Sequence, residues 1–252
     1  MKFSIITVVY NSVSTIERTI KSIMAQDYDD FEYIVVDGGS TDGTLEIIRT
    51  YASDIDVLIS EKDNGIYDAM NKACKHIHGD WVFFINGDDV FYNDKVLSSV
   101  SKKIGAKNTV YYGGVLMEPI SVKHDGVFNK KRLCQTNICH QSIFYPKIVF
   151  EKYHYNTKYR LYADWDLNIK CMGDNELNFC YLNELIAIFN VEGTSSTRDD
   201  RMFREDFHYI IKSVFGIEYY LYLYYLRVKM AALIVYYRIM KPNVQLDTWT
   251  IY

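Results

Sequence analysis

The 252-residue chain is poor in cysteine and proline and carries no excess of positive charge. Its five cysteines include no CxxC pair, and an odd, scattered set of this kind excludes both a disulfide framework and a thiolate zinc site. With three prolines, the chain has no long proline-rich linker. A formal net charge of -4 gives no basic surface, so we expect no nucleic-acid partner. We interpret the cysteines as reduced thiols of a cytoplasmic protein.

Apolar runs and helical periodicities alternate along the chain up to Lys95. The run at 3–9 is too short for a signal peptide and is interrupted by polar residues, so it predicts a buried strand. Runs rich in β-branched and aromatic residues predict three further strands, so the predicted strands are 3–9, 31–36, 57–60 and 81–85. Helical spacing predicts helices that begin near Ser14, Thr44 and Ile66, the first with a capping box from Ser14 to Glu17. This alternation is typical of an α/β fold with a mostly parallel sheet flanked by helices.

The pattern loosens after Lys95. Further strands are indicated at 109–112, 141–145 and 185–191, and a helix at 165–172 with Asp164 at its start. Helix dominates from Met202 onward. We therefore predict one α/β domain over residues 1–200 and a helical C-terminal extension over 201–252.

Acidic loops follow three of the predicted strands. Asp37 ends one strand, Asp63 follows another, and Asp88 with Asp89 follows a third. Ligands of open α/β sheets bind at the carboxyl ends of the strands, so these carboxylates should gather at one edge. A carboxylate pair suits a hard divalent cation, which can neutralise charge on a diphosphate. Each loop is also good turn sequence, and an ordinary turn remains the alternative for each one alone.

Several motifs follow one another along the chain: Thr7–Asn11, Val35–Thr44, Ser60–Ala73, Gly79–Trp81 and Phe84–Asp89. In this order they resemble the family 2 glycosyltransferases, most of all the bacterial branch that builds O-antigen, capsule and exopolysaccharide repeat units. The resemblance is close over about the first hundred residues and looser to about Thr197. It implies a GT-A fold, with a nucleotide-sugar half at about 1–105 and an acceptor half at about 106–200.

The resemblance also assigns residues to the donor. Those implied to bind the nucleotide sugar are Tyr10, Asn11, Asp37, Asp63, Asp88 and Lys72. Asp37 would contact the base or ribose, and Lys72 would face the phosphates unless it is an ordinary solvated lysine. Asp88 and Asp89 match the Asp-x-Asp region that holds Mn²⁺ or Mg²⁺, with Asp89 as the favoured metal ligand and Asp88 next. Asn86 stands where many members have the first Asp.

The family places its catalytic carboxylate in a Glu-Asp pair before a helix, which corresponds here to Ala163 and Asp164. Asp164 would take the proton of the acceptor hydroxyl, and helix capping is the alternative interpretation. Asp166 is expected at the surface or behind the site. The dipeptide His140-Gln141 would contact the acceptor or the diphosphate, unless His140 is a structural residue.

The resemblance thus implies an inverting glycosyltransferase. It would move a sugar from a nucleotide-diphosphate sugar, UDP favoured, to a glycan or polyprenol-linked acceptor in bacterial surface polysaccharide synthesis. A sugar nucleotidyltransferase and a Rossmann dehydrogenase are disfavoured because no glycine-rich loop follows the first strand. A catalytically silent nucleotide-binding scaffold of the same fold is the alternative, because Asn86 and Ala163 replace acidic residues of the family.

The segment 217–240 is rich in tyrosine and aliphatic residues but includes Arg227 and Lys229 near its middle. Burying these charges in a bilayer would cost a few kcal/mol each, so a spanning helix is disfavoured. We expect a helix that lies on a membrane surface or a partner, with packing on its own domain as the alternative. The protein would then be cytoplasmic, or peripheral on the inner face of the cell membrane.

Overall fold

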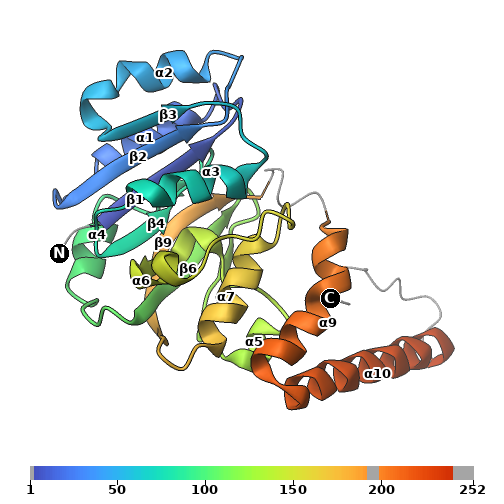
Figure 1. Ribbon diagram of the computed structural model, residues 1–252. Coiled ribbons are helices and arrows are strands. Elements are labelled where there is room, and N and C mark those ends of the chain that lie inside the picture. The colour runs from blue at the N-terminus through green and yellow to red at the C-terminus, as the bar shows by residue number, and fades with distance from the viewer. Residues whose placement is uncertain (1–2, 192–198, 241–252) are drawn as a thin grey trace.

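The computed structural model describes residues 3–191 and 199–240, with side chains to residue 234. Within this part of the chain, nine strands form one sheet in the order β3-β2-β1-β4-β8-β6-β9-β5, and β7 pairs with β6 at its side. Figure 1 shows this sheet between layers of helices, with the two C-terminal helices beyond it. The fold is therefore the mixed α/β architecture that the alternation predicted.

The first half of the sheet is parallel. Its strands are β1 (Phe3–Val9), β2 (Phe31–Asp37), β3 (Val57–Ser60) and β4 (Trp81–Phe84). They are connected by α1 (Ile16–Met24), α2 (Thr44–Thr50) and α3 (Ile66–Ala73). All of these elements were predicted from periodicity, to within a few residues at their ends.

The second half mixes strand directions. It contains β5 (Val90–Phe91), β6 (Thr109–Glu118), β7 (Val122–His124), β8 (Ile143–Pro146) and β9 (Asn178–Asn190). Strand β8 runs antiparallel to β4 and β6, whereas β9 is parallel to β6 and antiparallel to β5. The helices here are α4 (Val96–Ser101), α5 (Lys130–Leu133), α6 (Ile148–Lys152) and α7 (Ala163–Gly173). The sheet is thus less uniformly parallel than the sequence indicated.

Two apolar layers cover the sheet. Helices α1, α2 and α4 pack on one face, where Phe83 stacks on Phe91 and Phe144 with ring centroids 5.1 and 4.6 Å apart. Helices α3 and α7 pack on the other face with residues of α9 (Arg201–Phe215). Because successive strand residues face opposite layers, the continuous apolar runs of β1 and β4 fill both.

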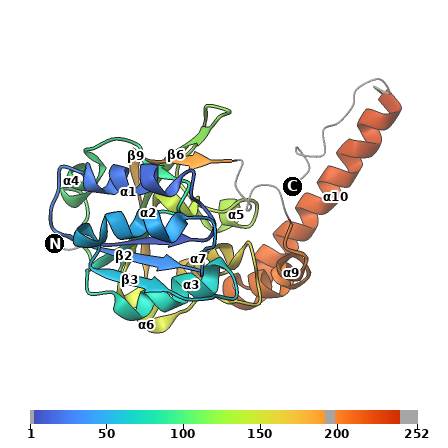
Figure 2. The same ribbon diagram turned by 90° about the horizontal axis from the view of Figure 1, so that it is seen from above.

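The two C-terminal helices differ in how far they pack on the domain. On α9, Phe203 is buried and packs against Trp165 of α7, with ring centroids 5.5 Å apart. Helix α10 (Ile217–Met240) then leads away from the sheet, as Figure 2 shows. It buries Leu223 but leaves Leu221 and Tyr224 exposed. None of the described helices is long and apolar enough to cross a membrane.

The predicted capping box at the start of α1 is wrong. Thr15 occupies the N-cap position, and no side chain caps this helix end. The Thr15 hydroxyl instead donates to the Gly87 carbonyl at 2.7 Å, and Glu17 pairs with Lys21 on the next turn. The start of α1 is therefore fixed by the loop after β4, which no local sequence pattern could reveal.

Gly113 lies where the register between β6 and β9 shifts, and a Cβ atom at this position would clash with its neighbours. A Cβ there would lie 2.4 Å from the Glu184 carbonyl oxygen and 2.6 Å from Ile186 Cγ1. We expect Gly113→Ala to lower the free energy of unfolding by about 1–3 kcal/mol or more, because the contact is with backbone that cannot move aside. Urea denaturation measures the change. Gly105→Ala is the control, since a Cβ at Gly105 meets nothing within 4 Å.

Candidate active site

The carboxyl ends of the parallel strands meet at one edge of the sheet, as the sequence predicted. The Gly38 amide after β2 donates to the Val9 carbonyl at the end of β1, at 2.9 Å. On the other side of β1, a Cβ at Gly87 would lie 2.8 Å from Val9 Cγ2, so the loop after β4 also packs against this strand end. The loops that carry Asp37 and the Asp88-Asp89 pair are thereby next to the loop of Tyr10 and Asn11.

Tyr10 and Asn11 form the rim of this edge. The Tyr10 side chain is 59% exposed and free to stack on a ligand. Asn11 has a positive φ of 49°, accepts a hydrogen bond from the Thr41 amide at 2.9 Å and donates its own amide to Ser40 Oγ at 2.8 Å. Asn11 therefore joins the loop after β1 to the loop after β2.

Asp37 and Asp63 take part in turns. Asp37 is fully buried, and its carboxylate accepts hydrogen bonds from the Ser40 amide and from Ser60 Oγ at 2.7 Å. Asp63 is half-buried, accepts from the Gly65 amide at 2.9 Å and lies so close to Gly38 that a Cβ there would be 2.4 Å from Asp63 Oδ2. The turn interpretation thus holds for both residues, and a direct contact of either with nucleotide stays a prediction.

Lys72 is occupied by neighbouring groups. Its ammonium group lies 2.9 Å from Glu61 Oε1 and 3.5 Å from Asp68 Oδ2, and it donates to the Lys62 carbonyl at 3.1 Å. In this arrangement Lys72 holds the 61–65 loop against α3. A phosphate contact would require it to exchange one of these partners.

The adjacent residues Asp88 and Asp89 have opposite environments. Asp89 is buried, with Gln141 Nε2 donating to one carboxylate oxygen at 2.8 Å and the Asn190 amide donating to the other at 3.0 Å. Burial, and then the charge of Asp88, raise the pKa of Asp89 well above its ordinary value. Asp88 is half-buried and faces a cavity of about 240 Å³ that Arg18, Glu118 and Asn190 also line. Burial raises the pKa of Asp88 as well.

The residues around Asp88 fit a divalent metal that is shared with a diphosphate. No group of three or more His, Cys, Asp or Glu residues within the described chain forms a complete metal cage. Magnesium, however, is commonly held by one or two carboxylates and substrate phosphates. Asp88 supplies such a carboxylate, and nearby Asn86 Oδ1 is buried without a hydrogen bond from any described residue. The Asp88 side of the pair is therefore better placed for a metal than the enclosed Asp89.

Asp164 lies in the first turn of α7 and is buried. The Tyr67 hydroxyl is 2.7 Å from its Oδ1, and Asn137 Nδ2 donates to its Oδ2 at 2.7 Å. Tyr162 occupies the N-cap position of α7, so Asp164 is not the capping residue. Burial raises the pKa of Asp164 to about 6, although the hydrogen bond from Tyr67 opposes the shift. A carboxylate with this pKa can act as a base near neutral pH.

The expectation for Asp166 is wrong with respect to the surface, because Asp166 is 2% exposed. Its carboxylate pairs with Lys170 at 2.7 Å, one turn further along α7. A helical (i, i+4) ion pair lets the lysine stem cover the buried acid while its charge remains partly solvated.

His140 and Gln141 point into different surroundings. Gln141 donates a hydrogen bond to Asp89, so its side chain lies at the strand-end edge of the sheet. His140 is buried against Phe84 and its Nε2 lies 2.7 Å from the Tyr155 hydroxyl. Burial lowers its pKa to about 3, so the ring is neutral at physiological pH. These surroundings are those of a structural residue, and a contact of His140 with the acceptor or the diphosphate stays a prediction.

Three residues of this region were not identified from the sequence: Tyr67, Asn137 and Arg160. Tyr67 lies within the motif Ser60–Ala73, but the sequence assigned it no role of its own. Asn137 and Arg160 lie in the stretch between Cys134 and Tyr162, where no pattern assigns a role. Tyr67 and Asn137 are hydrogen-bonded to Asp164 from 97 and 27 positions away in the chain. Arg160 lines a cavity together with Tyr67. No local sequence signal indicates either arrangement.

Comparisons with known proteins place these features in a family. A family model described as "Glycosyl transferase family 2" matches residues 4–166. The chain is 36% identical over 209 residues to a PGL/p-HBAD biosynthesis glycosyltransferase of Mycobacterium bovis, covering 80% of this chain and 82% of the relative. It is 38% identical over 96 residues to the putative teichuronic acid biosynthesis glycosyltransferase TuaG of Bacillus subtilis, covering 37% and 38% of the two chains.

Solved structures share the fold at low sequence identity. The structure of S. aureus TarS 1-349 in complex with UDP-GlcNAc superimposes with a TM-score of 0.65 at 19% identity, covering 100% of this chain and 69% of that one. The present chain spans 41% of the longer TarS chain. The mannosyltransferase PcManGT from Pyrobaculum calidifontis, in complex with GDP-Man and Mn²⁺, matches with a TM-score of 0.59 at 18% identity, covering 82% and 60%. With the family model spanning more than half of its length, the chain belongs to glycosyl transferase family 2.

Proposed function

We propose that this protein is an inverting glycosyltransferase that moves a sugar from a nucleotide-diphosphate sugar to an acceptor hydroxyl in bacterial surface glycan synthesis. Family membership supports glycosyl transfer. The names of the Mycobacterium and Bacillus relatives, which refer to PGL/p-HBAD and teichuronic acid biosynthesis, support surface glycan synthesis as the setting. The nucleotide sugars named with the TarS and PcManGT structures support this class of donor, and UDP is our choice of nucleotide.

The donor would lie across the strand ends. Tyr10 offers an exposed ring for the base, while Asn11, Asp37 and Asp63 fix the loops beneath it. The diphosphate would lie toward Asp88. A Mn²⁺ or Mg²⁺ ion bound there would neutralise charge on the departing nucleotide.

Asp164 would act as the base. The acceptor hydroxyl gives its proton to the Asp164 carboxylate while its oxygen forms a bond to the anomeric carbon. The bond from that carbon to the diphosphate oxygen breaks, and the nucleoside diphosphate leaves. Attack from the face opposite the nucleotide inverts the anomeric centre, and Tyr67 and Asn137 hold the carboxylate in place throughout.

The observation that carries this proposal is a buried carboxylate of raised pKa, Asp164, in a chain whose strand ends present a second acidic site. Nucleotide release from UDP-, GDP- and dTDP-sugars, measured with and without Mn²⁺ or Mg²⁺ and with membrane lipid extract as acceptor source, tests it. Metal-dependent consumption of one donor is the expected result. Nucleotide binding without any donor consumption would instead favour the silent scaffold that Asn86 and Ala163 suggested.

A pH profile of the transfer rate tests Asp164 as the base. Because the base must be unprotonated, we expect kcat to fall as the pH decreases through about 6. The Tyr67 hydrogen bond lowers the Asp164 pKa, so Tyr67→Phe should move this acidic limb to higher pH. Tyr153→Phe removes a similar phenol-to-carboxylate bond, to Asp174, away from the site and should leave the limb in place. An unmoved limb in Tyr67→Phe would contradict the assignment.

A polyprenol-linked acceptor would bring the protein to the inner face of the cell membrane. Exposed Leu221, Tyr224, Tyr225 and Val228 recur on one side of α10 at helical spacing, which suits the headgroup region. Sedimentation with liposomes tests this contact. We expect the double variant Leu221→Ser, Val228→Ser to co-sediment several-fold less with liposomes. Its rate of donor hydrolysis without liposomes should be unchanged.

A further inference from the structure

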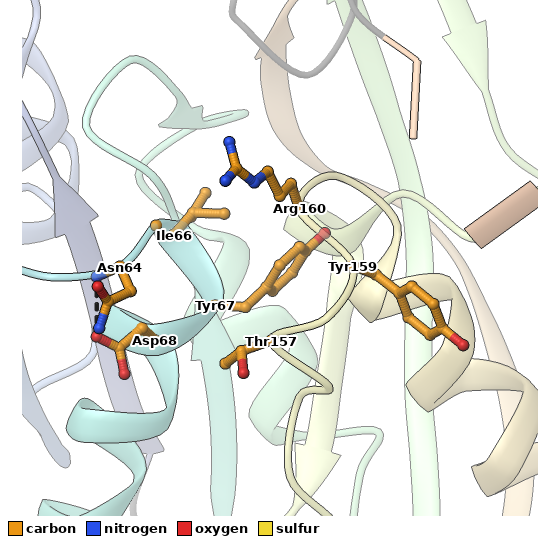
Figure 3. Close-up of a pocket in the computed structure, with 8 residues that line it drawn as sticks. Asn64, Ile66, Tyr67, Asp68, Thr157, Tyr159 and Arg160 are labelled. Atoms are coloured by element: carbon orange, nitrogen blue, oxygen red, sulfur yellow. Dashed lines mark hydrogen bonds between the residues drawn. The ribbon is translucent and has the colours of Figure 1, made fainter. Parts of the chain in front are cut away.

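A second cavity lies beside Asp164, on the α3 side of the strand ends. It has a volume of about 340 Å³, and the side chains that matter for its chemistry are those of Asn64, Ile66, Tyr67, Asp68, Thr157 and Arg160. Figure 3 shows it between the first turn of α3 and the loop before α7. This volume is at the lower end of the range for ligand pockets, so it suits one sugar ring or acidic group rather than a whole nucleotide sugar.

Tyr67 connects this cavity to the base. Its ring lines the cavity, and its hydroxyl lies 2.7 Å from Asp164 Oδ1 and 2.7 Å from the Leu161 carbonyl oxygen. A molecule in the cavity is therefore one side chain away from the carboxylate that would receive the acceptor's proton. Asp88, by contrast, belongs to the other cavity, which shares no lining residue with this one.

Arg160 gives the cavity its charge. Its side chain is exposed and extends over Ile66 in Figure 3, and it forms no hydrogen bond or ion pair with any residue in the described part of the chain. The carboxylate of Asp68 is already engaged by Lys72 at 3.5 Å and by the Asn64 amide at 3.0 Å. The nearby cation Lys158 is likewise paired, with Asp206. An arginine without an anion, beside an acid that is already paired, favours a ligand that brings a negative charge.

We infer that this cavity binds the acceptor and that Arg160 binds an acidic group on it, a phosphate or a carboxylate. This inference rests on the proposed function. Asn64 and Thr157 offer an amide and a hydroxyl to the rest of the acceptor, which would place its reacting hydroxyl toward Asp164. The acidic group can belong to a lipid-linked or to a water-soluble acceptor, because Arg160 recognises the same chemistry in both.

Two measurements on Arg160→Ala test the inference. The first is donor hydrolysis without acceptor, which reports the donor site alone. The second is transfer of radiolabelled sugar to lipid and aqueous cell extracts, each separated by anion exchange into acidic and neutral fractions. We expect the acidic fraction of one extract to accept label, and Arg160→Ala to raise the KM for it about 10- to 100-fold with hydrolysis unchanged. The active extract identifies the source of the acceptor.

Arg160→Lys and Arg49→Ala complete the set. The lysine variant keeps the charge but loses the two-pronged contact, so its KM should lie between those of the parent and Arg160→Ala. Arg49 is an exposed arginine on α2, and its removal should change neither quantity. Three results would overturn the inference: labelling confined to neutral fractions or absent from all of them, an unchanged KM in Arg160→Ala, or hydrolysis lost in parallel with transfer. A parent protein that consumes no donor overturns the proposed function as well.

Discussion

Asp164→Asn is expected to reduce sugar transfer by about 10²–10⁴-fold while nucleotide binding persists. The amide keeps the size of the side chain and can still accept the hydrogen bond from Tyr67, but it cannot take a proton from the acceptor. Rates of nucleotide release with acceptor present, and the Kd for the nucleoside diphosphate, measure the two properties separately.

The same variant should fold normally. Replacing a buried carboxylate whose pKa is raised by burial removes a charge that disfavours folding at neutral pH, whereas the hydrogen bond from Asn137 is lost. These effects oppose one another, so we expect Tm to change by no more than a few degrees. Asp166→Asn, on the same helix and also buried, is the matched control and should keep transfer within several-fold of the parent. Transfer within ten-fold of the parent in Asp164→Asn would exclude Asp164 as the base.

The second large effect is expected at the Asp88-Asp89 pair, where substitution of the one residue should reduce turnover and substitution of the other should lower Tm. Asp88 makes no side-chain hydrogen bond or ion pair to another described residue, and burial raises its pKa, so Asp88→Asn should not lower Tm. If it holds the metal, its loss removes several kcal/mol of charge stabilisation, and metal-stimulated turnover should fall about 100-fold or more.

Asp89→Ala should instead destabilise the fold. It leaves Gln141 Nε2 and the Asn190 amide buried without an acceptor, at about 1–3 kcal/mol each. Together the two groups cost about 2–6 kcal/mol, which for a domain of this size predicts a decrease in Tm of about 4–24 °C. Thermal unfolding and metal titration of both variants distinguish the assignments. A stable Asp89→Ala variant that has lost metal stimulation, beside an active Asp88→Asn, would return the metal to Asp89, as the family resemblance implied.

The parallel half of the sheet was predictable because its signals are local. Strand β1 is buried at every position, and its continuous apolar run is a pattern that the sequence displays directly. The position of Asp37 at a strand end follows from the same pattern. The sequence therefore located the strand-end edge correctly, together with the acidic loops that reach it.

The roles of individual carboxylates were less predictable because they depend on distant partners. Asp164 meets Tyr67 across 97 positions of the chain, and Asp89 meets Asn190 across 101. Such contacts decide which carboxylate of a pair is enclosed and which is open. Periodicity reports whether a residue lies on the buried face of its own element, but it carries no information about which polar group arrives from elsewhere.

The position of β9 between β6 and β5 affects how the protein matures on the ribosome. Strands β1 to β4 are the first to be synthesised and pair with one another, so their sheet can form early. Asp89 emerges with them, yet its partner Asn190 is the last residue of β9 and emerges about a hundred residues later. Gln141, the other donor to Asp89, emerges about halfway through this interval, and until Asn190 follows one oxygen of the buried acid has no donor and is costly to enclose. The nascent chain can therefore assemble its parallel strands before it can enclose the loop of Asp88 and Asp89 beside them.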